Sequence, residues 1–342
     1  MAGRVLTMRE LNRATLARQL LLERRRMSPK AVIERLVGMQ AQWPSAPYVG
    51  IWTRTTNFRR EALERELVRG TVVKATVMRQ TLHLLTLPDY ALIRAAMSET
   101  NFPWMSSLAG RLAPVVRKLA AGGPVTSTEA IALLESKHDL AGISARRAWR
   151  AARARAHLVH HHETALWNAR PEGRFVALDE PEAQVPLEAR AEMIRRYLAA
   201  FGPASLRDIV QWSMLHVPEL KASLATLDVR RYRAEGGREL FDVPRGPLPD
   251  PETPAPVRFL PKWDNVLLAF NDRTRVLPEP YRRKVIGQNG DVAQTFLVDG
   301  FVAGMWRVEK GRVKLEPLAR LSRAAQAELK DEAARLEAFL AG

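Results

Sequence analysis

Two segments of the chain follow the same order of expected elements, and this repetition limits the fold more than any other feature. Each segment starts with Gly-Pro and a capping Ser or Thr, at residues 123–131 and 202–209, where we expect a loop followed by a short helix. A helical segment precedes each start, and a longer helix and a hairpin follow it. This is the order of a winged helix-turn-helix unit. We therefore predict an α+β protein that contains tandem units of this kind.

The expected boundaries define three such units. The first copy of the repeat has helices expected at 109–121 and 144–158 and strands at 158–162 and 175–178, with a turn over 168–173. The second copy has helices at 187–201 and 217–227 and strands at 229–234 and 239–243. The N-terminal part follows a similar plan, with helices at 8–25, 29–39 and 60–68 and strands at 71–78 and 81–86. These patterns predict units at residues 1–105, 106–180 and 181–245.

The remaining part, residues 246–342, has a different character. It follows a stretch, 244–256, with six prolines among thirteen residues, which favours an extended strap. Five strands are expected beyond it, at 266–270, 284–286, 295–298, 301–308 and 313–317. An amphipathic helix is expected over 323–340. We predict a β-rich C-terminal segment closed by this helix.

The charge of the chain favours a polyanionic partner. Lys and Arg number 53 against 37 Asp and Glu, a net charge of +16, and such an excess suits the phosphates of nucleic acid. An Arg-rich composition that reflects only a GC-rich genome is the alternative. The absence of cysteine excludes disulfides, cysteine-ligated metals and thiol nucleophiles. Since no apolar run of 18 residues and no secretory signal is present, we expect a cytoplasmic protein that makes no contact with a membrane.

The run over residues 36–52, LVGMQAQWPSAPYVGIW, is the most informative one. A helix is expected to end near Gln40 and Gln42, because Trp43 precedes a proline and is thereby displaced from the α region. Two glutamines near the aromatic side chains of Trp43, Tyr48 and Trp52 suit a pocket for something planar. The alternative is that the glutamines only satisfy backbone groups at a helix end.

The same run resembles the winged-helix DNA glycosylases of the AlkZ/YcaQ type, which unhook interstrand crosslinks and remove bulky alkyl adducts. Three more stretches share the resemblance in the same order, so that it covers most of the chain: VVKATVMRQTLHLLTLPDY at 72–90, YLAAFGPASLRDIVQWS at 197–213 and LPKWDNVLLAFNDRTRVLP at 260–278. The resemblance implies that Gln40 and Gln42 form the catalytic Gln-x-Gln motif. Other members carry Asp at the second position, and the broader substrate range linked to that acidic form is not implied here.

This resemblance implies a glycosylase that hydrolyses the N-glycosidic bond of N7-alkylated purines, including crosslink adducts, in double-stranded DNA. Because the two glutamines supply no lysine nucleophile, we expect the enzyme to be monofunctional. An N7-alkylated purine is already cationic, so it leaves with little acid assistance, and the sugar becomes oxocarbenium-like. An amide can orient water but is no strong base. We expect Gln42 to orient the attacking water and Gln40 to hold that water or the deoxyribose, in a monomer that needs no cofactor. Self-resistance to a genotoxin is one biological setting for such an enzyme.

Several basic residues are candidates for contacts with DNA. Arg79 and His83 stand at an expected hairpin turn near the glutamines, where Arg79 can contact phosphate and His83 can line the site or only fill a half-buried position. The other candidates are Arg146, Arg150 and Arg153 on one expected helix face, Arg273 and Arg275 in a turn, and the cluster over 282–284. For each of them, a solvated charged surface is the alternative.

The sequence offers little support for a metal site or for another type of catalytic site. The three histidines at 160–162 are expected on a strand, where consecutive side chains alternate, so we predict no metal site there. No Gly-rich phosphate loop, nucleophile elbow or His-Glu-x-x-His motif is present. Two functions remain as alternatives to the enzyme: a non-catalytic winged-helix regulator, and a protein that sequesters a planar small molecule.

Overall fold

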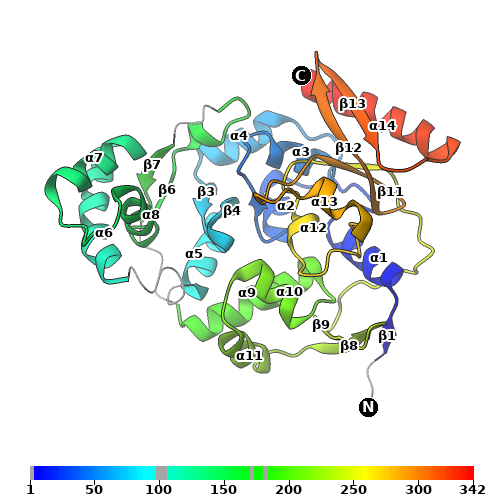
Figure 1. The fold of residues 1–342 in the computed structure, drawn as a ribbon, viewed down its shortest axis with the longest axis horizontal. Helices are drawn as coiled ribbons and strands as arrows, with labels where there is room; N and C mark the ends of the chain where they lie inside the picture. The colour runs from blue at the N-terminus through cyan, green and yellow to red at the C-terminus, as the bar shows by residue number, and fades with distance from the viewer. Residues whose placement is uncertain (1–3, 98–105, 170–172, 180–183) are drawn as a thin grey trace.

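Three β-sheets, each accompanied by helices, organise the chain (Figure 1). The structure is a computed structural model that describes residues 4–97, 106–169, 173–179 and 184–342. The mixture of helices and largely antiparallel sheets agrees with the predicted α+β class. The expected unit boundaries near 105 and 180, and part of the turn expected over 168–173, lie outside the described residues.

The N-terminal part contains five helices and a hairpin. Its elements are α1 (Met8–Arg18), α2 (Pro29–Arg35), β2 (Met39–Gln40), α3 (Ala46–Trp52), α4 (Arg60–Val68), β3 (Val72–Thr76), the 3-10 turn η1 (Met78–Gln80), β4 (Leu82–Thr86) and α5 (Leu87–Ala96). The expected helix over 60–68 and both expected strands are confirmed. The first two helices end earlier than expected, which leaves room for β2 and α3.

The middle unit reproduces the expected order of helices and hairpin. It comprises α6 (Ser106–Ala121), β5 (Val125–Thr126), α7 (Ser127–Lys137), α8 (Ala145–Arg155), β6 (Leu158–His160), η3 (His162–Ala165) and β7 (Arg174–Ala177). Thr126 and Glu129 form a reciprocal capping box at the start of α7. One sheet, ordered β2-β4-β3-β6-β7-β5, joins this unit to the N-terminal part through the register pair Lys74 and His160.

The third unit has the same order again, with a strand from the chain start added to it. Its elements are α9 (Pro186–Phe201), α10 (Leu206–Ser213), α11 (Val217–Ala225), β8 (Arg230–Ala234) and β9 (Glu239–Asp242). The N-terminal strand β1 (Val5–Leu6) pairs in parallel with β8. Leu6 and Leu11 pack there against Tyr232 and Leu240, so residues expected in the first unit contribute to the core of the third.

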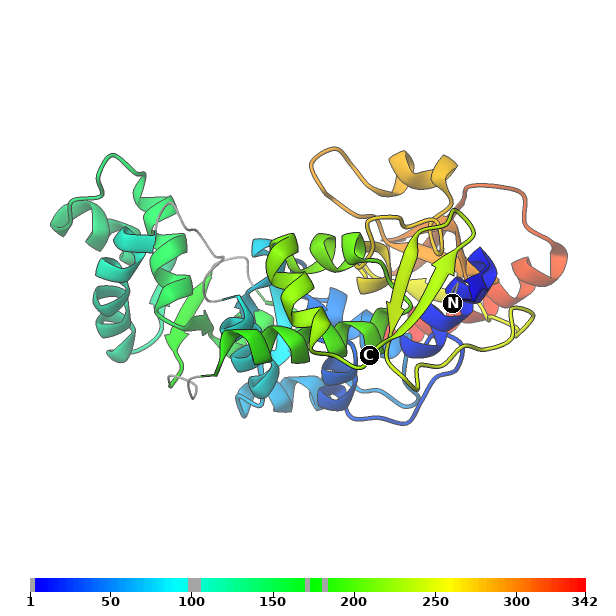
Figure 2. The same ribbon diagram turned by 90° about the horizontal axis from the view of Figure 1, so that it is seen from below.

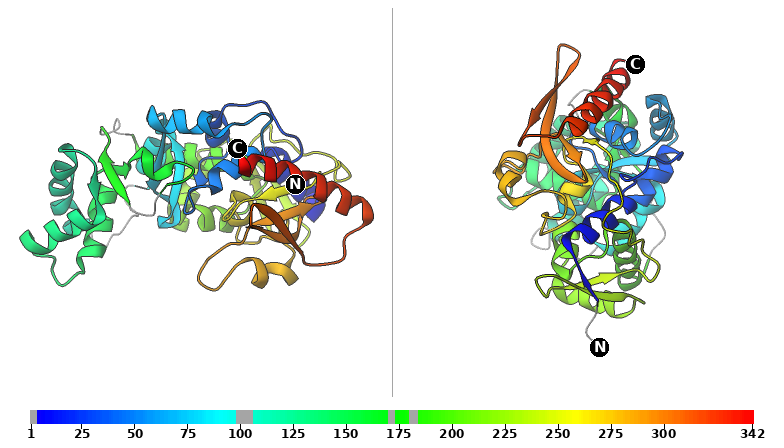
Figure 3. Two further views of the ribbon diagram at one scale, coloured as in Figure 1. Left: turned by 90° about the horizontal axis from the view of Figure 1, so that it is seen from above. Right: turned by 90° about the vertical axis from the view of Figure 1, so that its right-hand side faces the viewer.

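The C-terminal segment forms a four-stranded antiparallel sheet of β10 (Arg258–Leu260), β11 (Thr295–Val298), β12 (Phe301–Glu309) and β13 (Arg312–Pro317). The final helix α14 (Arg323–Ala341) lies beside this sheet (Figure 3). The strands expected at 266–270 and 284–286 are wrong, because these residues lie in the short helices α12 (Asn265–Leu268) and α13 (Arg282–Val285). A further 3-10 turn, η4 (Glu279–Tyr281), precedes α13.

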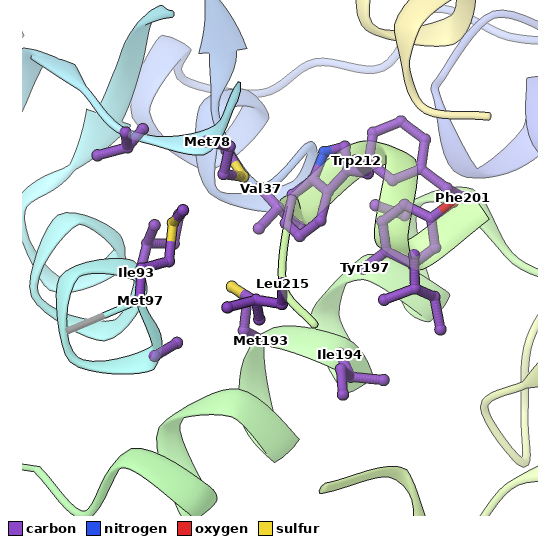
Figure 4. Close-up of a cluster of buried hydrophobic side chains, with 14 of the residues drawn as sticks. Val37, Met78, Ile93, Met97, Met193, Ile194, Tyr197, Phe201, Trp212 and Leu215 are labelled. Atoms are coloured by element: carbon purple, nitrogen blue, oxygen red, sulfur yellow. The ribbon is translucent and has the colours of Figure 1, made fainter. Parts of the chain in front are cut away.

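A buried aromatic cluster joins the third unit to the rest of the chain (Figure 4). Tyr197, Phe201 and Trp212 pack against one another, and the ring centroids of Tyr197 and Trp212 are 4.9 Å apart. Met78 from the turn η1 belongs to the same cluster. The turn is therefore packed against the third unit. In the described part of the chain, no helix is both long and apolar enough to cross a membrane.

Candidate active site

The two glutamines lie on and just after β2, an edge strand that pairs with β4. Gln40 stands opposite His83 in this pair, so the expectation of a helix ending near Gln40 is wrong. The chain leaves the helical region earlier because Val37 and Gly38 have φ of 54° and 90°. A Cβ on Gly38 would come within 2.5 Å of the Leu85 side chain, so only glycine fits there.

Gln40 is almost fully buried, with 7% of its surface exposed. Its side-chain Oε1 accepts a hydrogen bond of 3.0 Å from Nη2 of Arg79. Its backbone N–H donates to Oδ1 of Asn265 at 3.4 Å, and Nδ2 of Asn265 donates to the carbonyl of Gly38 at 2.7 Å. Both the backbone and the side chain of Gln40 are therefore fixed by other parts of the fold.

Arg79 is half-buried, and its guanidinium faces three acceptors within the protein. Besides Gln40, its guanidinium donates to the carbonyl of Trp212 at 2.8 Å and to Nε2 of His83 at 3.2 Å. Nδ1–H of His83 in turn donates to the carbonyl of Thr81 at 3.0 Å, so His83 is the neutral tautomer with the proton on Nδ1. These bonds engage Nη1 and Nη2 of Arg79, and the predicted contact of Arg79 with phosphate stays a prediction.

Burial sets the charge states of this pair. Burial lowers the pKa of His83 to about 3, and the positive charge of Arg79 lowers it further. Burial also lowers the pKa of Arg79 to about 10, with a contribution from Arg273, so Arg79 stays charged at neutral pH. His83, 2% exposed, is an inner partner of Arg79 and not an open wall of a pocket.

Gln42 lies at the surface, unlike Gln40. Its Oε1 accepts a hydrogen bond of 2.8 Å from the backbone N–H of Leu82. The neighbouring Trp43 is 57% exposed. Both side chains line a pocket with a volume of about 470 Å³, together with Lys74, His160 and Trp167.

Of the three rings predicted to form an aromatic pocket, Trp43 lines this one, whereas the other two lie elsewhere. Tyr48 is fully buried, where its hydroxyl donates to the carbonyl of Ala165. Trp52 stacks on Phe339 of α14 with ring centroids 5.7 Å apart. Both lie on the helix α3, whose inner face packs into the core.

Lys74 is a pocket residue that the sequence analysis missed. It is 6% exposed, and its Nζ donates to the carbonyl of Thr164 at 2.8 Å. Burial lowers its pKa to about 8. A lone lysine inside the apolar run Val72–Thr76 was the available signal, because a strand buried on both faces rarely carries an ammonium group.

The other basic candidates divide into exposed and buried ones. Arg146 and Arg150 are exposed on α8, and Arg150 donates to Oε1 of Gln80 at 3.3 Å. Arg153 turns inward, stacks over Phe175 and donates to Thr76, so the three do not share one solvent-facing stripe.

The predicted DNA-contacting turn around 273–275 is also wrong in part. Arg275 is 3% exposed, donates to the carbonyl of Pro203 and lies over Phe270. Arg273 is partly buried and donates to the carbonyl of Leu267. The exposed basic residues of this region lie further on, in α13: Arg282, Arg283 and Lys284. The signal for these residues in the sequence was that three basic residues follow one another directly.

The histidine run does not have the alternating strand geometry that was predicted for it. Strand β6 ends at His160, so the next residues do not alternate between two faces. Among the described residues, the ligand atoms of His161, His162 and Glu163 lie within 4.8 Å of one another. Arg174 donates to Glu163 at 3.3 Å and so competes for that carboxylate.

Comparison with known proteins decides between the functions that the sequence left open. A family model described as "DNA glycosylase AlkZ-like" matches residues 33–339. The molecule is therefore a DNA glycosylase, a hydrolase that acts on N-glycosyl bonds in DNA, and the chain belongs to that family.

Two similarities to proteins of Streptomyces sahachiroi extend over nearly the whole chain. One protein, an interstrand DNA cross-link repair glycosylase, is 23% identical over 356 residues, which cover 93% of this chain and 92% of the relative. The solved structure of the DNA glycosylase AlkZ matches this one with a TM-score of 0.81 at 22% sequence identity. The match covers 98% of this chain and 97% of the AlkZ chain. The structural similarity shows a shared fold.

Proposed function

We propose that this protein is a monofunctional glycosylase that releases N7-alkylated purines, including bulky and interstrand-crosslinked ones, from double-stranded DNA. The single observation that carries the proposal is the pair of oriented neutral amides at β2, Gln40 and Gln42, beside the exposed Trp43. The Streptomyces sahachiroi relative supports the crosslink substrate by its name. We further propose that the enzyme acts on DNA in the cytoplasm and that it acts as a monomer.

We interpret the repeated order of elements as three winged-helix units. The sequences α6, α7, α8, β6, β7 and α9, α10, α11, β8, β9 support this interpretation for the second and third units. The N-terminal part is less regular, because β1 and α1 pack elsewhere and β2 and α3 interrupt the order. Helix α8 occupies the position of a recognition helix and is rich in exposed arginine.

The chemistry required of the site is modest. The N7-alkylated base leaves as a neutral group once the glycosidic bond has broken, so the protein has to orient water and stabilise a cationic sugar. Oε1 of Gln42 has one lone pair engaged by the N–H of Leu82, and the second one is free to accept from a water molecule. We propose that Gln42 orients the attacking water and that Gln40 contacts the damaged nucleotide.

An open site suits a bulky or crosslinked base. Gln42 and Trp43 are both exposed, so a base that is still attached to the opposite strand can approach them without entering a closed pocket. The exposed Trp43 ring offers a stacking surface. In Figure 2, the middle unit and the segment with α13 project to the same side of the molecule, with the α9–α11 region between them. We propose that the exposed arginines of α8 and α13 contact DNA phosphates on the two sides of the lesion.

Excision of N7-methylguanine from a defined duplex tests the proposal. Wild-type protein is expected to leave an abasic site that alkali cleaves, and Gln42→Ala is expected to slow the single-turnover rate by about 10²-fold. Gln326→Ala, at an exposed position on α14, serves as a control with unchanged rate. Excision by Gln42→Ala at the wild-type rate would contradict the role of Gln42. A covalent adduct trapped by borohydride would contradict the monofunctional mechanism.

A further inference from the structure

The guanidinium of Arg79 is a half-buried positive charge without a carboxylate partner in the described part of the chain. Its hydrogen-bond acceptors are Oε1 of Gln40, Nε2 of His83 and the carbonyl of Trp212, all of them neutral. Burial of an uncompensated charge is costly, and folds retain such features mainly where function requires them. The position of Arg79 directly behind Gln40 therefore calls for a functional explanation.

Arginine determines which end of the Gln40 amide faces the protein. A guanidinium only donates hydrogen bonds, so it has to meet the oxygen of the amide and not its nitrogen. His83 cannot reverse this arrangement, because its one N–H donates to the carbonyl of Thr81. The Gln40 side chain therefore has one orientation, with Oε1 toward Arg79 and Nε2 away from it.

The Nε2 group of Gln40 remains available. Within the described residues it donates to no protein group, and it is not among the polar atoms sealed from solvent without a partner. Gln42 differs, since its exposed carbonyl retains a free lone pair. The two amides thus present different chemistry: Gln40 offers donors, and Gln42 offers an acceptor.

The turn that carries Arg79 is built to direct this side chain inward. Arg79 and Gln80 both have positive φ, 53° and 55°, which is unfavourable for residues other than glycine. Arg150 of the middle unit donates to Gln80, and Arg153 donates to Thr76 before the turn. The carbonyl of Trp212 holds the other side of Arg79. Contacts from two further units thus maintain the strained turn.

We propose that Arg79 is a positioning residue that orients Gln40 as a hydrogen-bond donor to a sugar or phosphate oxygen of the damaged nucleotide. This inference rests on the proposed function. A donor is unsuited to the attacking water, because it withdraws electron density from the nucleophile, whereas the same donor suits an anionic or lone-pair-bearing oxygen of the nucleotide. Arg79 acts through Gln40 and does not contact the DNA.

A set of variants measured in single turnover on an N7-methylguanine duplex tests this inference. Arg79→Met is expected to slow excision by about 10²-fold, the size of effect typical of a misplaced group. Its affinity for undamaged duplex, and the salt dependence of that affinity, are expected to stay at wild-type values. Arg79→Lys, which keeps the charge but not the fork of donors, is expected to recover part of the rate.

Gln40→Glu separates the donor role from a structural role. A carboxylate still accepts from Arg79, so the thermal unfolding midpoint is expected to equal or exceed that of wild type, while the rate falls as far as in Gln40→Ala. In the Gln40→Ala background, Arg79→Met is expected to add no further loss, because the two residues act as one unit.

The possible outcomes separate the two claims. Wild-type rates in Gln40→Glu would overturn the donor role, and this test does not depend on whether Arg79→Met folds. Multiplying losses in the double variant, or a weaker salt dependence of DNA binding in Arg79→Met, would overturn the positioning role. If Gln40→Ala slows excision and Arg79→Met does not, only this inference fails. If wild-type protein releases no alkylated base, the proposed function fails and this inference fails with it.

Discussion

Arg54 and Asp264, which are 210 positions apart, form a buried ion pair in which two guanidinium nitrogens donate to the two carboxylate oxygens at 2.7 and 2.8 Å. Arg54 follows α3, and Asp264 also caps α12 by accepting from the N–H of Val266. The next residue, Asn265, accepts from the N–H of Gln40. The pair therefore places the C-terminal segment against the strand that carries the candidate catalytic amide.

Removal of one member of this pair is expected to be strongly destabilising. Asp264→Ala leaves the Arg54 guanidinium buried without its partner, and we expect the free energy of unfolding to fall by about 3–5 kcal/mol in urea titrations. Glu239→Ala provides the control, since its pair with Arg231 is exposed on both sides and should contribute less than about 1 kcal/mol. Equal losses in the two variants would show that the buried pair has no special role.

Lys74 is expected to destabilise the protein at neutral pH. Burial lowers its pKa from 10.5 to about 8, so the unfolded chain binds a proton more tightly than the folded one. Lys74→Met removes a desolvation cost of about 3 kcal/mol and one hydrogen bond worth about 1 kcal/mol, for a net gain of about 2 kcal/mol at pH 7.

The pH dependence identifies Lys74 as the source of this effect. Wild-type stability should rise between pH 8 and 10.5, where only the unfolded state is protonated at Lys74, and Lys74→Met should lack that rise. Lys118→Met, at an exposed position, should keep it. Parallel curves for wild type and Lys74→Met would contradict the assignment.

His83 is expected to make stability fall with acidification. Its pKa is about 3 in the folded protein and near 6.5 when unfolded, so the unfolded state alone takes up the proton between these values. The contribution of neutral His83 to the free energy of unfolding is therefore fully present above pH 6.5. Below pH 6.5 this contribution decreases by up to about 1.4 kcal/mol per pH unit. The pKa of His160 is also lowered, by burial and by Lys74, and adds a second proton.

Urea titrations from pH 5 to 7.5 check this expectation. His83→Gln keeps an acceptor for Arg79 and cannot be protonated in this range, so its stability should depend on pH with a smaller slope than that of wild type, by up to one proton. The remaining slope comes from His160 and from His161, whose pKa is also lowered by burial. The glycosylase rate at saturating DNA should show no inflection near pH 6.5 that belongs to His83. An unchanged slope in His83→Gln would place the proton uptake elsewhere.

Locally encoded features were predictable from the sequence. The repeated units carry capping boxes at Thr126 and Ser205, and the helices that these residues start appear where the pattern predicts them. The strands over 295–298 and 313–317 were also predicted to within one residue, because turn residues flank them. The cluster of polar and aromatic residues beside two prolines singled out Gln42 and Trp43, and only the family resemblance gave Gln42 its expected catalytic role.

Features that depend on distant contacts were not predictable. The run 266–270 is apolar, and a short apolar run does not distinguish a buried strand from a buried helix. In the structure, Asp264 caps the first turn of α12, which favours the helix. Arg79 and Arg275 have the composition of a DNA contact, yet carbonyl groups from other units turn both of them inward. The pairing of β1 with β8 joins residues more than 200 positions apart.

Arg146 and Arg150 of α8 are expected to bind phosphate. Each replacement by Ala should weaken binding to undamaged duplex and lower the magnitude of the slope of log K against log salt by about 0.9, the value for one phosphate contact. Arg195→Ala is the control, because Arg195 is paired with Glu192 on α9. Binding constants measured from 50 to 300 mM salt test this prediction. An unchanged slope would mean that α8 does not contact the DNA.

Trp43 is expected to select for bulky adducts. Its side chain is 57% exposed beside Gln42, so Trp43→Ala should leave the free energy of unfolding nearly unchanged. A stacked base or planar adduct loses about 1–3 kcal/mol of binding free energy without the ring, which corresponds to roughly 5- to 150-fold in affinity. N7-methylguanine offers little extra surface to the indole, so its excision should fall much less than that of a large aromatic N7 adduct. Competition between the two duplexes in one reaction measures this ratio directly. A ratio equal to that of wild type would mean that Trp43 contacts DNA without discriminating between lesions.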